Sequence, residues 1–246
     1  MVSPAVPVLF RLLKFNEDSS IIEDACYALA FLWENYENII PNDMKRDLCE
    51  IVSIFFKQST ATRHLLALRM IERMVAGGAA QIDVVISCRV LPGLCAVLEN
   101  SSKQTIKSKV CDITSYITAG TVSQIAAVLE TRLLVAMIPL LRSGHSISDN
   151  AAAAIANVII HGDPQQVQLV NRGWLTLLFE QLSKSERGIL CMLEAMNQIL
   201  RVLEKDAMPN AIKEIKEHLR VLTDHINWDI NQKAKNLWDK YFGMPQ

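Results

Sequence analysis

The stretch GTVSQI at residues 120–125 has three counterparts along the chain: ENYENI at 34–39, GGAAQI at 77–82 and GDPQQV at 162–167. In each of them an Asn or Gln, four residues after the first residue of the stretch, is followed by Ile or Val. Successive amide residues are separated by 43, 43 and 42 positions. A repeat of this length in a chain of helical character predicts an α-helical solenoid, a class of fold that presents extended surfaces to partners.

The unit from residue 125 to residue 166 shows what one repeat contains. Apolar periodicity predicts helices at 125–130, 133–141 and 149–160. Ser148 or Asp149 is the expected N-cap of the third helix, and Gly162 follows its end. Three helices in about 42 residues are typical of armadillo repeats rather than of two-helix repeats.

The same layout is expected along the whole chain. Further helices are predicted at 8–14, 20–33, 51–57, 62–76, 91–99, 104–119, 175–182, 189–204, 211–223 and 227–242. We therefore expect an all-α fold, a right-handed armadillo superhelix of about five three-helix repeats, with units at about 1–40, 41–82, 83–124, 125–166 and 167–210. Residues 211–246 are expected to form a terminal cap, in which Trp228 and Trp238 close the end of the array.

Composition narrows the function classes. The 246 residues carry a formal net charge of −1, whereas nucleic-acid binders and proteins of anionic membranes normally carry an excess of Lys and Arg. No apolar run approaches the roughly 18 residues of a membrane span, and no signal peptide is visible, so we expect a soluble intracellular protein. The six cysteines show no paired spacing, which predicts free and mostly buried thiols in a reducing compartment.

No pattern in the sequence predicts catalysis, a cofactor or a metal ion. None of the five histidines belongs to a helical zinc-protease motif, and there is no Gly-rich phosphate loop. Asp112 would raise the pKa of its neighbour Cys111, so a thiolate nucleophile is not expected. Lys103, Lys107 and Lys109 are expected on a solvated helix face. A binding protein is the class that remains.

Four short stretches then point to a known family. They are EDACYAL at 23–29, ALRMI at 67–71, ITAG at 117–120 with QI at 124–125, and WDKYFG at 238–243. In this order and spacing they resemble importin-α, the nuclear-import adaptor, from its fourth armadillo repeat to its last. The resemblance covers essentially the whole chain.

The resemblance implies a peptide groove on the third helix of each repeat. There the family presents a Trp, whose faces hold lysine stems of a localisation signal, and one turn later an Asn that holds the peptide backbone. The matching positions in this sequence are Tyr27/Phe31, Arg69/Arg73, Asp112/Tyr116, Ala153/Asn157 and Glu194/Gln198.

The groove chemistry departs from the family at most of these positions. None keeps the Trp, and only Asn157 keeps the Asn, which makes it the expected backbone contact. Arg73 adds a like charge beside Arg69 and would repel a basic peptide. We expect a partner that is less basic opposite this pair and basic opposite Asp112 and Glu194.

The resemblance also implies the partners: protein cargo or an extended peptide in the groove, and an export receptor at the C-terminal repeats. Importin-β binding is not expected, because no basic N-terminal arm is present. The chain is either a piece of a longer product or a shortened paralogue. We expect a transport adaptor of cytoplasm and nucleus that performs no reaction. The alternative is a degenerate armadillo scaffold that has lost signal binding and serves as a protein–protein interaction module.

Overall fold

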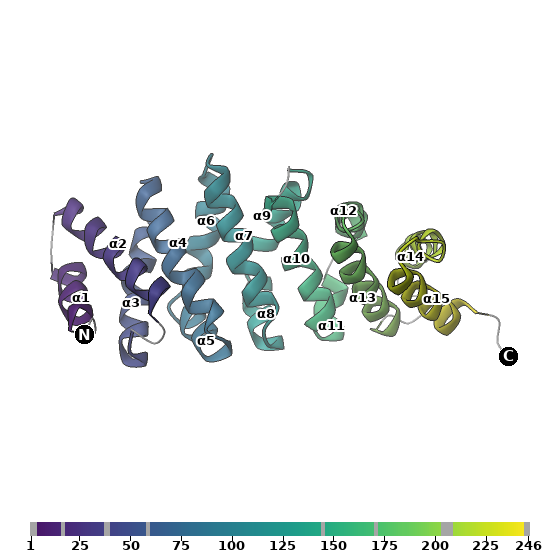
Figure 1. The fold of residues 1–246 in the computed structure, drawn as a ribbon, viewed down its shortest axis with the longest axis horizontal. Helices are drawn as coiled ribbons and strands as arrows, with labels where there is room; N and C mark the ends of the chain where they lie inside the picture. Colours follow the sequence, from purple (N-terminus) through teal and green to yellow (C-terminus); the bar gives the residue numbers. More distant parts are fainter. Residues whose placement is uncertain are drawn as a thin grey trace. The chain divides into compact units, whose positions relative to one another are not determined.

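A computed structural model describes residues 4–15, 18–36, 40–57, 60–143, 146–169, 172–202 and 209–243. Within these ranges every regular element is helical (Figure 1). The chain divides into two compact units, residues 1–136 and 137–246, and each is described by itself. The predicted all-α class therefore holds for the described part of the chain, and Asn38 of the first repeated stretch lies outside it.

Unit 1 consists of two rows of long helices joined by short ones (Figure 1). In one row α2, α4 and α7 lie side by side, and in the other α1, α3 and α6 pack against them and against one another. Short helices α5 and α8 connect successive pairs, and α9 begins at the end of the unit. The bounds are α1 Ala5–Phe15, α2 Ser19–Asn35, α3 Asn42–Phe55, α4 Ala61–Ala76, α5 Ala79–Ser87, α6 Val90–Asn100, α7 Gln104–Thr118, α8 Val122–Leu129 and α9 Leu133–Met137.

Unit 2 repeats this arrangement. Helices α10, α13 and α15 form one row, while the 3₁₀ helix η1, α12 and α14 form the other. Short helix α11 contacts α10 and α13. The bounds are η1 Ile138–Arg142, α10 Ser146–His161, α11 Pro164–Leu169, α12 Arg172–Leu182, α13 Glu186–Val202, α14 Pro209–Leu222 and α15 Trp228–Phe242.

The repeated Gln is a helix cap that also bonds to the preceding repeat. At the start of α8 the Thr121 hydroxyl accepts from the Gln124 backbone N–H at 3.3 Å, and Gln124 Oε1 accepts from the Thr121 N–H at 3.0 Å, which completes a capping box. The Gln124 Nε2 donates to the Ala79 carbonyl at 2.9 Å and to Asp83 Oδ1 at 2.7 Å, both on α5. Gln124 is only 1% exposed, so this one amide joins the short helices of two repeats inside the core.

The other repeats use related contacts. At α11 the Asp163 carboxylate accepts from the Gln166 N–H at 2.8 Å, and Gln166 Oε1 accepts from the Asp163 N–H at 3.1 Å. The Gln81 amide, turned to satisfy both of its neighbours, donates to the Gly77 carbonyl and accepts from Lys45 Nζ at 3.2 Å. Gln124 and Gln166 are buried and Gln81 is half-buried, so within the described residues the period of 42–43 positions is a period of amide contacts.

A glycine opens three of the four repeated stretches and leaves room for the amide. A Cβ atom on Gly120 would overlap Gln124 Oε1, and one on Gly162 would overlap the Val158 carbonyl and approach Gln166. Because any larger residue would displace the cap or the end of the preceding helix, the glycine and the amide work as one motif.

Several helix bounds differ from the sequence-based predictions. Helix α10 begins at Ser146, so Ser148 and Asp149 lie in its first turn and the predicted N-cap is wrong; Ser148 is buried and accepts from Gln181 Nε2 at 2.9 Å. The helix predicted at 133–141 divides into α9 and η1, since Pro139 has no N–H to donate. Helix α3 begins nine residues before the predicted position 51.

Two predicted burial patterns have opposite outcomes. Four of the six cysteines, Cys26, Cys49, Cys95 and Cys111, are buried and free, as predicted. Burial, with a smaller contribution from Asp112, raises the pKa of the Cys111 thiol to about 12. Trp228 is 72% exposed at the start of α15, so the prediction that it closes the end of the array is wrong. Its exposed position follows from its place as the first residue of the helix, before the packed turns.

Within the described ranges no single helix is long and apolar enough to cross a membrane; two pairs of short helices meet these criteria only when taken together across a sharp bend. The same ranges contain no cluster of three or more His, Cys, Asp or Glu side chains suited to a metal ion.

We expect Gln124→Ala to lower the free energy of unfolding by about 2–3 kcal/mol, because it leaves the Thr121 N–H and the Ala79 carbonyl without their buried partner. Urea unfolding followed by circular dichroism measures this change. Gln104→Ala, which removes an exposed amide at the start of α7, is the matched control and should shift stability by less than about 0.5 kcal/mol. Equal effects of the two substitutions would contradict the role given to Gln124.

Candidate functional site

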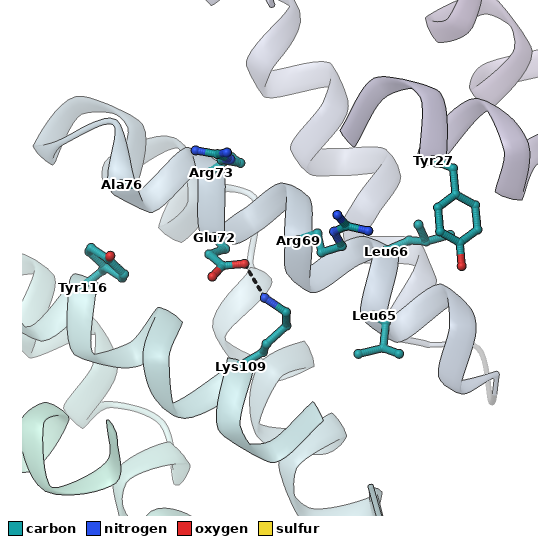
Figure 2. A pocket seen from close by; sticks show the side chains of 9 residues that line it. All are labelled: Tyr27, Leu65, Leu66, Arg69, Glu72, Arg73, Ala76, Lys109 and Tyr116. Atoms are coloured by element: carbon teal, nitrogen blue, oxygen red, sulfur yellow. Dashed lines mark hydrogen bonds and ion pairs between the residues drawn. The ribbon is translucent and has the colours of Figure 1, made fainter. Parts of the chain in front are cut away.

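A cavity of about 640 Å³ opens on the row formed by α2, α4 and α7 of unit 1 (Figure 2). Helix α4 supplies most of its lining, α7 supplies two side chains, and α2 supplies one. The lining residues are Tyr27, Leu65, Leu66, Arg69, Glu72, Arg73, Ala76, Lys109 and Tyr116. Four of these, Tyr27, Arg69, Arg73 and Tyr116, are groove residues predicted from the sequence, so the structure brings residues 89 positions apart to one cavity.

Helix periodicity explains why these side chains face outward. In α4 the residues Leu68, Met70, Ile71 and Met74 are buried, and this leaves the intervening polar residues on the open side of the helix. Arg69 and Arg73 are four residues apart and therefore lie one turn apart on the same face. The sequence of α4 thus decides which face of the helix packs against its neighbours and which face carries charged side chains.

Aromatic side chains frame the cavity. Tyr27 on α2 is 48% exposed and Tyr116 on α7 is 45% exposed. Figure 2 shows them on opposite sides of the two arginines. Phe31, one turn after Tyr27, is 62% exposed but does not line the cavity. Half-exposed aromatic rings of this kind are common anchors in protein–protein contacts.

Glu72 and Lys109 were missing from the groove residues predicted from the sequence. Lys109 Nζ lies 2.6 Å from Glu72 Oε2, and both side chains are about one-third exposed. This contact joins α4 to α7 at the cavity (Figure 2). The prediction that Lys109 belongs to a solvated face is wrong, because the row of helices brings α7 against α4. The sequence could have indicated that Lys109 belongs to the groove, because Lys109 is one turn before Asp112 and therefore lies on the same face of the helix.

Asp112 stands beside this ion pair rather than in the cavity lining. Burial raises the pKa of Asp112 above its ordinary value of 3.8, and the neighbouring Glu72 carboxylate raises it further, against the opposing effect of Lys109. The Lys109 ammonium group therefore lies near two carboxyl groups, Glu72 and Asp112.

The predicted groove residues of unit 2 are distributed differently. A second cavity, of about 460 Å³, opens between α13 and α15 and is lined by Leu190, Cys191, Leu193, Glu194, Asn197, Lys233, Asn236 and Leu237. It contains Glu194 from the predicted set, whereas Gln198 on α13 and Asn157 on α10 are half-buried and line neither cavity. Asn197, the neighbour of Gln198, was not predicted; its Oδ1 accepts from the Tyr241 hydroxyl at 3.0 Å.

We expect Asp112→Asn to raise the free energy of unfolding at neutral pH, because it removes a partly buried charge beside Glu72. A carboxyl group whose pKa rises on folding stabilises the fold while it is protonated, and this contribution is lost as the pH rises through the folded-state pKa. The advantage of the variant should therefore grow from about pH 4 towards about pH 7. Urea unfolding across this range measures it, with the exposed Glu50→Gln as control. An advantage independent of pH would contradict the assignment.

Comparisons with known proteins connect this geometry to a family. No protein-family model matches the chain. Importin subunit alpha-1a of Oryza sativa subsp. japonica is 33% identical over 132 residues, which are 53% of this chain and 25% of that protein. Importin subunit alpha-4 of Arabidopsis thaliana is 28% identical over 256 residues, covering 98% of this chain and 47% of that protein. The chain thus spans less than half the length of these curated relatives.

Comparison with solved structures shows which fold the chain adopts. A computationally designed armadillo repeat protein for modular peptide recognition matches with a TM-score of 0.84 and 21% identity, over 96% of this chain and 99% of that one. A designed armadillo repeat protein in complex with the peptide (KR)4 matches with a TM-score of 0.81 and 20% identity, again over 96% and 99%. The predicted armadillo fold is confirmed. The chain is an armadillo-repeat protein whose curated relatives are importin-α subunits.

Proposed function

We propose that this chain is a protein-binding armadillo module, an importin-α-like transport adaptor that holds an extended peptide on its long helices and performs no reaction. The cavity on α2, α4 and α7 is the observation that carries the proposal, because it gathers four side chains that the resemblance to importin-α had assigned to a groove. Its exposed rings and charged groups belong to the side of the helices that does not pack.

The residue types suit an extended peptide. A peptide without secondary structure offers one N–H and one C=O per residue, and these need partners when the peptide is bound. Amide side chains can donate and accept at once and so pair with a peptide bond whatever the side chain. Unit 2 offers such amides at Asn157, Asn197, Gln198 and Asn236, of which Asn197 and Asn236 line its cavity.

The aromatic side chains supply the apolar part of the contact. Tyr27, Phe31 and Tyr116 leave about half or more of their surface open to solvent in the free chain. Covering such a ring gains apolar burial at a small cost in side-chain entropy, since a tyrosine has few rotatable bonds. A partner that crosses successive helices would meet these rings in turn.

The relatives support the finer parts of the proposal. Importin-α subunits are named for import, and a designed armadillo protein of the same fold is in complex with the peptide (KR)4. On this basis we propose protein cargo as the partner and a location in cytoplasm and nucleus. An export receptor as a further partner of the C-terminal helices is proposed from the resemblance of the sequence to importin-α.

One observation favours the second candidate, an armadillo scaffold that has lost signal binding. Arg69, Arg73 and Lys109 all line the unit 1 cavity, and like charges there oppose a lysine-rich peptide. The scaffold would keep the peptide groove but hold a different partner in it.

Fluorescence anisotropy with labelled (KR)4 tests the adaptor proposal. We expect binding that weakens as salt rises, and a loss of about tenfold in affinity for Asn157→Ala, because one hydrogen-bonding amide is worth about 1–1.5 kcal/mol. Gln168→Ala, an exposed amide on α11 of the same unit, should leave the affinity unchanged.

Two results would count against it. If a folded chain does not bind (KR)4, the adaptor proposal is wrong, and the armadillo scaffold that has lost signal binding is favoured. Equal losses for Asn157→Ala and Gln168→Ala would show that the peptide is not held where the resemblance to importin-α implies a groove.

A further inference from the structure

We propose that Cys49 and Cys88 form a reversible disulfide bond when a hydroperoxide oxidises the chain, so that this pair is a redox modification site within unit 1. The inference is independent of peptide binding. It concerns two residues 39 positions apart, which the spacing of the cysteines in the sequence did not connect.

The end of helix α5 lies against helix α3. Cys88 is the C-cap of α5, and its Sγ atom lies 4.0 Å from the carbonyl oxygen of Arg46 on α3. The Gln81 amide, on α5, accepts from Lys45 Nζ, on α3, at 3.2 Å. Two contacts between neighbouring residues of α3 and the two ends of α5 therefore hold these helices together.

The Arg46 carbonyl group also indicates where the Cys49 side chain lies. A short side chain in a helix can reach the carbonyl oxygen three residues before it, as the hydroxyl groups of Ser53 and Ser87 do at 2.7 Å and 2.8 Å. Cys49 is three residues after Arg46 on α3. Its sulfur atom and that of Cys88 are therefore neighbours, and the two thiol groups hydrogen-bond to each other.

The two thiols differ in their access to solvent. Cys49 is fully buried, and burial raises the pKa of its thiol above the ordinary value of 9.0, with a further contribution from Cys88. Cys88 is half-buried, so a small oxidant can reach its sulfur atom. A redox-active pair combines an accessible cysteine that meets the oxidant with a neighbouring cysteine that completes the bond, and the structure gives these parts to Cys88 and Cys49.

With hydrogen peroxide the reaction balances in two steps. The Cys88 thiolate attacks one peroxide oxygen, the O–O bond breaks, and a sulfenic acid forms at Cys88 while the other oxygen leaves as water. The Cys49 sulfur then attacks the Cys88 sulfur, the S–S bond forms, and the S–O bond breaks as a second water leaves with the Cys49 proton. The two thiols lose two electrons and two protons, and a thiol reductant restores them by exchange.

The bond has a consequence for stability. It joins the end of α5 to α3, and α5 is the helix whose first residues receive the Gln124 amide from the next repeat. A cross-link that closes a long loop stabilises a fold mainly by restricting the unfolded chain. We therefore expect the oxidised chain to unfold at a higher urea concentration than the reduced chain, and dithiothreitol to reverse the shift.

Peptide mapping without reduction tests the inference. Trypsin cleaves after Lys and Arg, so residues 47–57 form a peptide whose only cysteine is Cys49, and residues 74–89 form one whose only cysteine is Cys88. After the folded chain is treated with hydrogen peroxide, we expect these two peptides to be joined, with a mass about 2 Da below their sum for the two lost hydrogens. Thiol titration of the unfolded product should show the loss of two of the six thiols.

Two variants separate this pair from the other cysteines. Cys88→Ser should abolish the joined peptides, because it removes one sulfur atom and keeps the size of the side chain. Cys191→Ser is the matched control, since Cys191 is also half-buried and is the only cysteine of unit 2. It should leave the joined peptides unchanged. Circular dichroism of each variant confirms that it is folded.

Four results would overturn the inference. One is a sulfinic acid at Cys88 without the joined peptides, and another is a bond between any other pair of cysteines. A covalent dimer on a non-reducing gel would show that the sulfur atoms pair between chains. A bond that forms only after the chain is unfolded in urea would show that the fold does not bring Cys49 and Cys88 together.

Discussion

The buried glutamine amide between successive short helices is the contact on which the other features of unit 1 depend. Gln124 caps α8 and at the same time bonds to Ala79 and Asp83 of α5, so the start of one repeat is fixed to the start of the previous one. Because the short helices lead into the long ones, this contact fixes how the chain turns after α7. A core of non-directional apolar contacts alone would allow helices to slide; a hydrogen bond with defined partners does not.

The arrangement of the long helices then decides the chemistry of the open face. Helix α4 packs against α2 on one side and α7 on the other, and its unburied face therefore lies between theirs. Side chains from three helices that are far apart in sequence meet there. Armadillo folds of this kind separate stability from specificity: the packed face is constrained by apolar contacts, while the open face can change charge with little effect on the fold.

The sequence predicts the parts of this structure that repeat. The period of 42–43 residues and the long helices follow from spacing, and Arg69 and Arg73 share the open side of α4 because an i, i+4 pair on a packed helix lies on one face. That Tyr27 and Tyr116 belong to a groove was implied by the resemblance to importin-α rather than by spacing. The contact of Lys109 with Glu72 could not be predicted in this way, since it depends on how far α7 lies from α4. The prediction that Ser148 is an N-cap was wrong for a related reason. A polar side chain can cap the start of a helix or be buried within it, and the partner of Ser148, Gln181, is more than thirty positions away. The roles of Asn157 and Gln198 stay predictions, as neither lines a cavity described above.

The glycines at the repeat boundaries have a consequence for how such a chain can vary in length. A Cβ atom on Gly120 would overlap the amide of Gln124, and one on Gly162 would overlap the Val158 carbonyl and closely approach Gln166, the amide four residues later. An insertion between the two partners would separate them, and a deletion would force them to overlap. Viable changes in length must therefore fall elsewhere or add and remove whole periods. For protein engineering this makes the glycine–amide stretches natural junctions: two armadillo chains joined within them exchange complete helical modules, and the hydrogen bonds of the junction are restored by the incoming sequence.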